Sequence, residues 1–236
     1  MSSTGRIEVT SMLMTLSGPS TRAWSHLDAR LPDGGAVVLR PLRPGETEAL
    51  EAVFDGLSPR SRRQRYLTSM PRLPGYARRV LANVDARDHV AWLALVAGRP
   101  AGICRYVRTG RDTAELAFEV VDAEQGRGVG SVLVDAVTTV ARASGVEWLE
   151  VVVEPDNAAS VVLLTRLGIR LHLNDGLLEG RGRLRPLDPP SGVDRGAVRA
   201  AAIQHAGAIE DDEVAGGSGH EASKPREARD AELAPT

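Results

Sequence analysis

The chain has 236 residues, enough for one domain or two small ones, and a formal net charge of −2. A charge so close to zero provides no overall basic field, so we expect no nucleic-acid partner. The single cysteine, Cys104, excludes an internal disulfide, and its apolar neighbours indicate a buried structural thiol.

The N-terminal part, residues 1–33, is rich in Ser, Thr and Gly and lacks a sustained hydrophobic period, so we expect a flexible segment. Its apolar run at 12–16 is too short for the core of a signal peptide. No run in the chain approaches the roughly 18 apolar residues of a membrane span. We therefore expect a cytoplasmic protein with no membrane partner.

A folded domain is predicted over residues 34–188. It begins with a strand at 35–40 and an amphipathic helix near 47–57. A second helix follows, with Ser58 as its N-cap and Pro59 as its first residue. Arginines of this second helix could bind an anion, although a solvated helical face is favoured; they are Arg60, Arg62, Arg63 and Arg65.

Strands and helices follow one another in the rest of the domain. The predicted strands are 89–96 and 100–108 as a hairpin, 113–121, 147–154, and finally 169–173 and 184–187 around a loop at 174–182. The predicted helices are 76–84, 129–144 and 157–167. Beyond them, residues 189–236 are rich in Ala, Gly and acidic residues, which favours a mostly disordered tail over a short helix at 197–209.

A glycine-rich stretch, Glu124 to Ser131 (EQGRGVGS), lies where the strand at 113–121 leads into the helix at 129–144. The start of a helix has unpaired N–H groups and a partial positive charge, which suits a phosphate. Glycines without a Cβ let the backbone curl around such an anion. We interpret the stretch as a pocket for the diphosphate of a coenzyme.

Three glycine-rich phosphate-binding motifs compete as explanations of this stretch. A P-loop requires Gly-Lys-Ser/Thr, and the stretch has no lysine. A dinucleotide motif requires a third glycine where Ser131 stands. The pattern Gln/Arg-x-x-Gly-x-Gly/Ala is matched by Gln125, Gly128 and Gly130. A glycine turn with only a structural role is the remaining alternative.

With this motif between a strand and a helix, the chain resembles the GNAT superfamily of acyl-CoA-dependent N-acetyltransferases over roughly residues 35–188. The segments LRPLRPGE, LSPRSRRQRYL and DARDHVAWLALVAG resemble the acetyltransferase domain of bacterial protein-lysine acetyltransferases. The resemblance implies an α/β (α+β) fold with helices flanking a mixed, mostly antiparallel sheet of six to seven strands. Its fourth and fifth strands are expected to splay apart around the pantetheine arm.

Acetyl-CoA is the co-substrate that the resemblance implies. The glycine-rich loop would hold its diphosphate, and N–H groups of the fourth strand would contact the thioester. Asn157 would either reach the coenzyme or only cap its helix. The expected coenzyme-binding residues are Phe118, Val120, Gln125, Gly126, Arg127, Gly128, Val129, Gly130, Ser131 and Asn157.

Two glutamates, Glu115 and Glu119, share one face of the strand at 113–121. Transfer to a lysine requires a neutral amine, which costs roughly 4.6 kcal/mol at pH 7, and a nearby carboxylate can take that proton. Glu115 matches the general base of the protein-lysine-acetylating branches, and Glu119, near an expected strand bulge, would assist or contact the amine. The alternative is a surface pair bound to arginines.

Two residues depart from the family pattern: Ile169 replaces a phenylalanine, and Leu164 stands where many members have a tyrosine that protonates the leaving sulfur. We therefore expect an N-acetyltransferase that acts on a protein lysine or a small primary amine in a ternary complex. A catalytically weak acetyl-CoA-binding sensor or adaptor is the alternative. The five histidines are scattered, so we expect no metal. Both a monomer and a homodimer are compatible with the sequence.

Overall fold

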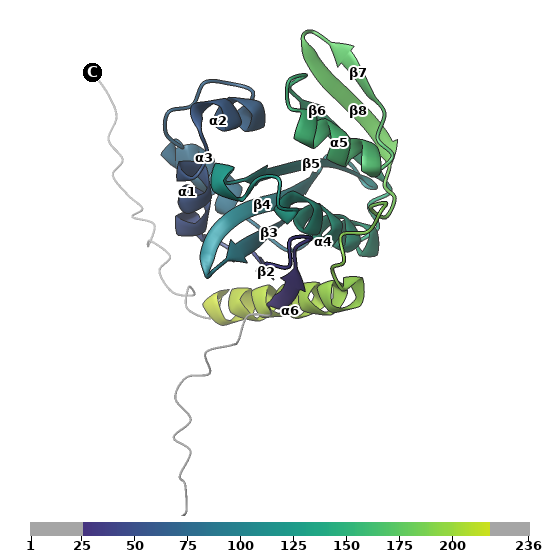
Figure 1. The fold of residues 1–236 in the computed structure, drawn as a ribbon. Coiled ribbons are helices and arrows are strands. Elements are labelled where there is room, and N and C mark those ends of the chain that lie inside the picture. Colours follow the sequence, from purple (N-terminus) through teal and green to yellow (C-terminus); the bar gives the residue numbers. More distant parts are fainter. Residues whose placement is uncertain (1–25, 218–236) are drawn as a thin grey trace, which may run out of the picture.

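One sheet of eight strands, in the order β1-β2-β3-β4-β5-β6-β8-β7, forms the centre of the computed structural model, which describes residues 26–217 (Figure 1). Only the β5–β6 pair is parallel, so the expected mixed, mostly antiparallel sheet is confirmed, with more strands than the six to seven predicted. The strands are β1 Leu27–Arg30, β2 Ala36–Pro41, β3 His89–Val96, β4 Arg99–Arg108, β5 Thr113–Val120, β6 Trp148–Val153, β7 Leu171–Asn174 and β8 Leu177–Arg183.

Helices cover both faces of this sheet and enclose two hydrophobic clusters. The larger cluster packs α4 against the sheet, and the smaller one packs α1 and α3 on the other face. Among residues 26–217, no helix has both the length and the apolar character needed to cross a membrane. The helices are α1 Thr47–Asp55, α2 Pro59–Tyr66, α3 Gly75–Ala82, α4 Val129–Ala143, α5 Ala158–Arg166 and α6 Arg195–Gly217, with a 3₁₀ turn η1 at Asp122–Glu124.

Strand β5 lies at the centre of the fold. Its Leu116, Phe118 and Val120 pack with the α4 cluster, as the period of two predicts. Beside it, β6 pairs in parallel only along Thr113–Glu115, opposite Trp148–Glu150. Beyond Glu115 the two strands separate, which confirms the expected splay.

Part of the N-terminal segment expected to be flexible is a strand. Residues Leu27–Arg30 form β1, which pairs antiparallel with β2, and Leu31 is buried in the larger cluster. The pairing explains the difference, because β1 satisfies its backbone hydrogen bonds along β2 and not in solvent. The other residues of that segment, 1–25, lie outside the described residues.

The last strands also differ from the prediction. Residues 174–182, expected as a loop, belong mostly to β7 and β8, which form a hairpin. Its turn is Asp175-Gly176, with φ values of 45° and 82° that match a tight hairpin turn. Leu184 and Leu187, predicted as strand residues, instead lie in a loop and bury their side chains in the larger cluster.

The expectation of a disordered tail is wrong for residues 195–217, which form α6. This helix packs against α4, β1 and β2, and lies along the lower edge of the domain in Figure 1. Its buried residues recur at helical spacing, which supplies the packing energy that the tail composition did not suggest. They are Val198, Ala201, His205 and Ile209. The remainder of the tail, residues 218–236, lies outside the described residues.

Candidate active site

A cavity of about 650 Å³ occupies the gap where β5 and β6 separate. Its walls are residues of these two strands, its far end is the glycine-rich loop with the first turn of α4, and α2 and α5 contribute the sides. Nearly all the residues predicted from the sequence line it: Glu115, Phe118, Glu119, Val120, Gln125, Gly126, Gly128, Val129, Gly130, Ser131 and Asn157.

The start of α4 opens into this cavity without a side-chain cap. Its N-cap residue is Gly128, in the left-handed conformation with φ of 97°. A Cβ at this position would lie 2.6 Å from Pro32 Cδ, so both the backbone conformation and the close approach of β1–β2 require glycine. The first N–H groups of the helix have no intrahelical partner, so this turn is a candidate site for an anion.

Arg127 is the exception among the predicted coenzyme-binding residues, because its side chain does not line the cavity. Its Nε lies 2.7 Å from Asp33 Oδ2, and its other end pairs with Glu124. Two carboxylates thus hold the guanidinium on the β1–β2 side of the loop. Its side chain thus braces the loop from outside the cavity.

Asn157 has the capping role that the sequence allowed. Its side-chain Oδ1 accepts a hydrogen bond of 3.1 Å from the N–H of Ser160, at the start of α5. It also lines the cavity. Capping therefore fixes Asn157 at the wall of the cavity, where contact with a coenzyme stays a prediction.

The main chain of β5 presents hydrogen-bond donors to the cavity. The N–H of Val121 donates to Ala101 O, 2.9 Å away on the β4 side. Because donors alternate along an antiparallel pair, the N–H groups of Phe118 and Val120 point to the opposite, unpaired side. The bulge expected near Glu119 is wrong, since the β4–β5 register is continuous from Gly102 to Arg108.

The two glutamates of β5 have different environments. Glu119 is buried, with a side chain 3% exposed, and its Oε2 lies 3.3 Å from Arg65 Nε on α2. Glu115 is exposed, lines the same cavity and forms no ion pair with the rest of the described chain. It stands at the last paired position of β5 and β6, where the gap begins. The carboxylate of Glu119 is therefore held in an ion pair, whereas that of Glu115 is available to a ligand in the cavity.

Sequence reasoning missed a buried arginine, Arg105, on the same face of the sheet. Its Nη1 donates to Leu81 O at 2.8 Å and lies 3.1 Å from His89 Nε2. Burial lowers the pKa of Arg105 to about 10, still far above neutral pH. A charged residue at an inward position of an apolar strand was the signal that could have identified it.

His89 beside this arginine predicts a pH-dependent stability. Burial and the positive charge of Arg105 lower the pKa of His89 from 6.5 to about 4. Between these values the unfolded chain binds more protons, so the free energy of unfolding falls as the pH decreases from about 6.5 towards 4. The loss from one such group is at most about 1.4 kcal/mol per pH unit.

Urea denaturation at pH 7.5 and pH 5 measures this dependence. We expect His89→Gln to lose less stability than the wild type over this interval. The exposed residue His172 provides the control, and His172→Gln should keep the wild-type difference. His205, whose pKa is also lowered to about 4 by burial, contributes equally in all three proteins. An unchanged pH dependence in His89→Gln would contradict the prediction.

Helix α2 is joined to the opposite side of the cavity by polar contacts. Arg60 Nη2 lies 3.3 Å from Asp156 Oδ2, and Gln64 Nε2 donates to Asp156 Oδ1 at 3.1 Å. The side chain of Arg60 is nevertheless 69% exposed, in keeping with the favoured solvated face. Arg65, on the inward side, forms the ion pair with Glu119.

Two further side chains, Cys104 and Leu164, supply no reactive group to the cavity. Cys104 is fully buried, and burial raises the pKa of its thiol, so it is a structural residue. Leu164, at the position of the family's tyrosine, packs in the larger cluster and also lines the cavity, but its aliphatic side chain has no proton to donate. Within residues 26–217, no group of three or more His, Cys, Asp or Glu side chains is placed to hold a metal ion.

Comparison with known proteins agrees with this geometry. The family model described as an acetyltransferase (GNAT) domain matches residues 36–170, more than half of the chain. This chain belongs to the GNAT acetyltransferase family. Residues 184–194 and helix α6 lie beyond the matched region.

Relatives and solved structures share the domain. Acetyltransferase Pat of Mycolicibacterium smegmatis is 38% identical over 92 residues, which cover 37% of this chain and 28% of the relative. Acetyltransferase PA5475 of Pseudomonas aeruginosa is 30% identical over 148 residues, 61% of this chain and 80% of the relative. The GNAT domain of S. lividans PAT superposes with a TM-score of 0.63 at 29% identity, covering 67% of this chain and 97% of that domain.

A longer structural neighbour is the cAMP-binding acyltransferase from Mycobacterium smegmatis. It superposes with a TM-score of 0.58 at 26% identity, and the match covers 78% of this chain and 56% of the neighbour. The chain thus spans little more than half of this neighbour and less than a third of the Pat relative.

Proposed function

We propose that the protein is an acetyl-CoA-dependent N-acetyltransferase, whose acceptor is a primary amine of a protein lysine or a small molecule. The observation that carries the proposal is the uncapped start of α4, which opens into the cavity between β5 and β6. It offers N–H donors to a diphosphate, while the N–H groups of Phe118 and Val120 point towards the space for the thioester. Membership of the GNAT family supports this use of the cavity.

In the proposed reaction, the amine attacks the thioester carbonyl carbon directly, and the C–S bond breaks as the C–N bond forms. Glu115 takes the proton of the amine, directly or through a water, because within residues 26–217 it is the cavity carboxylate that forms no ion pair with an arginine. The coenzyme leaves as a thiolate, which a thiol pKa near 8.5 makes tolerable. Glu119 and Arg65 fix the position of α2 beside the acceptor.

The environment of Leu164 favours a second candidate, a catalytically weak sensor or adaptor that binds acetyl-CoA. A buried leucine cannot protonate the leaving sulfur, and this side chain is packed into the core. Calorimetry with acetyl-CoA, followed by turnover with a panel of primary amines, separates the candidates. Binding without turnover on any amine favours the sensor, whereas turnover establishes the enzyme.

The variant Ser131→Asp tests the anion site. An acidic residue in the first turn stabilises a helix by about 0.3–1 kcal/mol, but here it would repel the phosphates of the coenzyme. We expect affinity for acetyl-CoA to fall at least about tenfold, with no loss of thermal stability. Calorimetry and thermal unfolding measure the two quantities. Ser131→Asn, similar in size and uncharged, is the control, and equal affinities of the two variants would contradict the site.

A further inference from the structure

Arg166, the last residue of α5, brings a positive charge to the wall of the cavity. Its Nη1 donates a hydrogen bond of 3.0 Å to the Oγ of Ser131, in the first turn of α4. A guanidinium therefore lies beside the uncapped N–H groups of that turn. The partial charge of the helix and the full charge of the arginine have the same sign at this place.

This charge has no acidic partner within residues 26–217. The side chain bonds only to neutral oxygens, Ser131 Oγ and the carbonyl of Pro189, and none of the ion pairs includes it. Its Nε is buried and has no hydrogen-bond partner. Partly buried arginines normally have an anion at hand, because an unpaired guanidinium away from water is costly. An anion bound in the cavity beside the start of α4 would pair with this charge.

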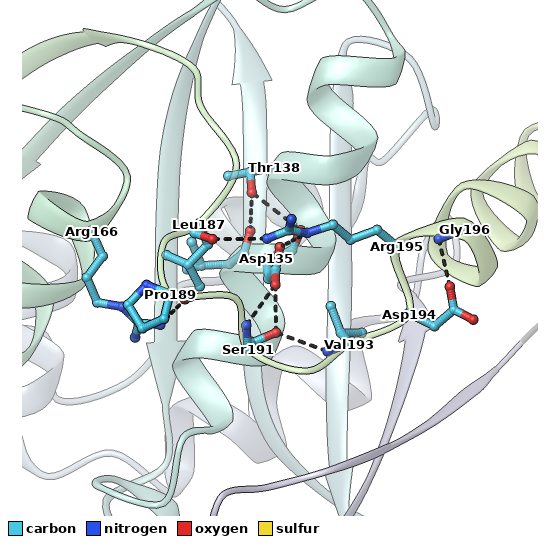
Figure 2. A network of polar contacts seen from close by, with 11 residues as sticks. Asp135, Thr138, Arg166, Leu187, Pro189, Ser191, Val193, Asp194, Arg195 and Gly196 are labelled. Carbon is cyan, nitrogen blue, oxygen red and sulfur yellow. Dashed lines mark hydrogen bonds and ion pairs between the residues drawn. The ribbon is translucent and has the colours of Figure 1, made fainter.

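The segment between β8 and α6, residues 184–194, which we call the strap, fixes the orientation of Arg166. The Nη2 of Arg166 donates to Pro189 O at 2.6 Å, and Asp188 N donates to the Arg166 carbonyl at 3.3 Å. Figure 2 shows the strap passing Arg166 at Pro189 and reaching Asp135 of α4 at Ser191, before α6 begins at Arg195.

At its other end the strap is attached to α4 itself. The buried carboxylate of Asp135 accepts hydrogen bonds from Ser191 N, Ser191 Oγ and Arg195 Nε, at 3.0, 2.8 and 2.7 Å (Figure 2). The strap thus joins the end of α5 to the middle of α4. Both helices line the cavity, so Arg166 is held in a fixed position relative to the start of α4.

We propose that Arg166 binds the diphosphate of the coenzyme through its guanidinium, together with the backbone N–H groups at the start of α4. This inference rests on the proposed function and assigns a side-chain ligand at the same site. The diphosphate is favoured over other phosphates of the coenzyme, because the guanidinium already contacts Ser131 in the turn that would hold it. The strap positions the arginine and makes no contact with the coenzyme.

The test measures the affinities of acetyl-CoA and of acetyl-dephospho-CoA, which lacks the 3′-phosphate but keeps the diphosphate. We expect Arg166→Gln to weaken both ligands by the same factor, between about tenfold and about a hundredfold, as the loss of a charged hydrogen bond predicts. Arg166→Lys keeps the charge and should recover part of the affinity. Arg170→Gln, an exposed arginine near the same end of α5, is the matched control and should bind as the wild type does.

The outcomes separate this inference from the proposed function. A wild type that does not bind acetyl-CoA overturns both. If the wild type binds and Arg166→Gln binds equally well, the role of Arg166 alone is overturned. A loss confined to acetyl-CoA, with acetyl-dephospho-CoA unaffected, refutes the diphosphate as the group that Arg166 contacts. A similar loss in Arg170→Gln would reveal a general effect of surface charge and would also overturn the assignment.

Discussion

Glu115→Gln should lower kcat by about 10²–10⁴-fold and leave the affinity for acetyl-CoA unchanged. The amide has nearly the shape of the carboxylate but cannot accept the proton of the attacking amine. Glu115 is exposed at the position where β5 and β6 separate, so the substitution leaves no buried group without a partner. Steady-state kinetics with an amine substrate, and calorimetry with acetyl-CoA, measure the two effects.

Glu150→Gln is the matched control for this experiment. Glu150 lies directly beside Glu115 in the β5–β6 register, but it contacts Arg181 and Thr109 and does not line the cavity. We expect its kcat to stay within about twofold of the wild type, since solvated ion pairs contribute little. Full activity of Glu115→Gln would remove Glu115 as the base. Restored activity of that variant at high pH, where the amine is already neutral, would instead support the assignment.

Glu119 shows how far the sequence could predict the different roles of the two glutamates. Their spacing placed both on one face of a strand, and both do line the cavity. The pattern carried no sign of Arg65, which reaches Glu119 from α2, over 50 residues earlier in the chain. Tertiary contacts of this kind decide which carboxylate is free, and local periodicity does not contain them.

The glycine-rich loop was the most predictable part of the site, because its requirements are local. A left-handed residue at Gly128 and an uncapped helix start follow from a short motif between a strand and a helix. By contrast, Arg127 belonged to the same motif, yet Asp33 from the β1–β2 turn holds its side chain away from the cavity. Backbone geometry was predictable here, whereas the direction of a long side chain was not.

The ends of the domain were predicted least well, for two different reasons. The turn at Asp175-Gly176 is a strong hairpin signal that the loop prediction overlooked. Helix α6 had a weaker signal, since Val198, Ala201 and His205 are spaced for one face but lie in a composition typical of a tail. Its first residue, Arg195, pairs with Asp135 of α4, a buried anchor that only the fold reveals.

The ion pair between Asp135 and Arg195 leads to the prediction with the largest effect on stability. Arg195→Met should lower the free energy of unfolding by about 3 kcal/mol, the lower end of the range for breaking a buried ion pair. Asp135 is 1% exposed and would keep only the two hydrogen bonds of Ser191. Arg195 is 30% exposed, so water compensates part of the loss, which is why the lower end applies. Urea denaturation at pH 7.5 measures the change.

A second substitution distinguishes an unpaired charge from lost packing. In the double variant Asp135→Asn with Arg195→Met, the buried charge disappears, so we expect it to be more stable than Arg195→Met alone. Arg183→Met is the control, because its pair with Glu147 is 67% and 57% exposed and should contribute less than about 1 kcal/mol. If Arg195→Met is no more destabilising than Arg183→Met, the strap does not depend on this ion pair. Additive losses in the double variant would show that packing of the arginine stem, and not its charge, holds the strap to α4.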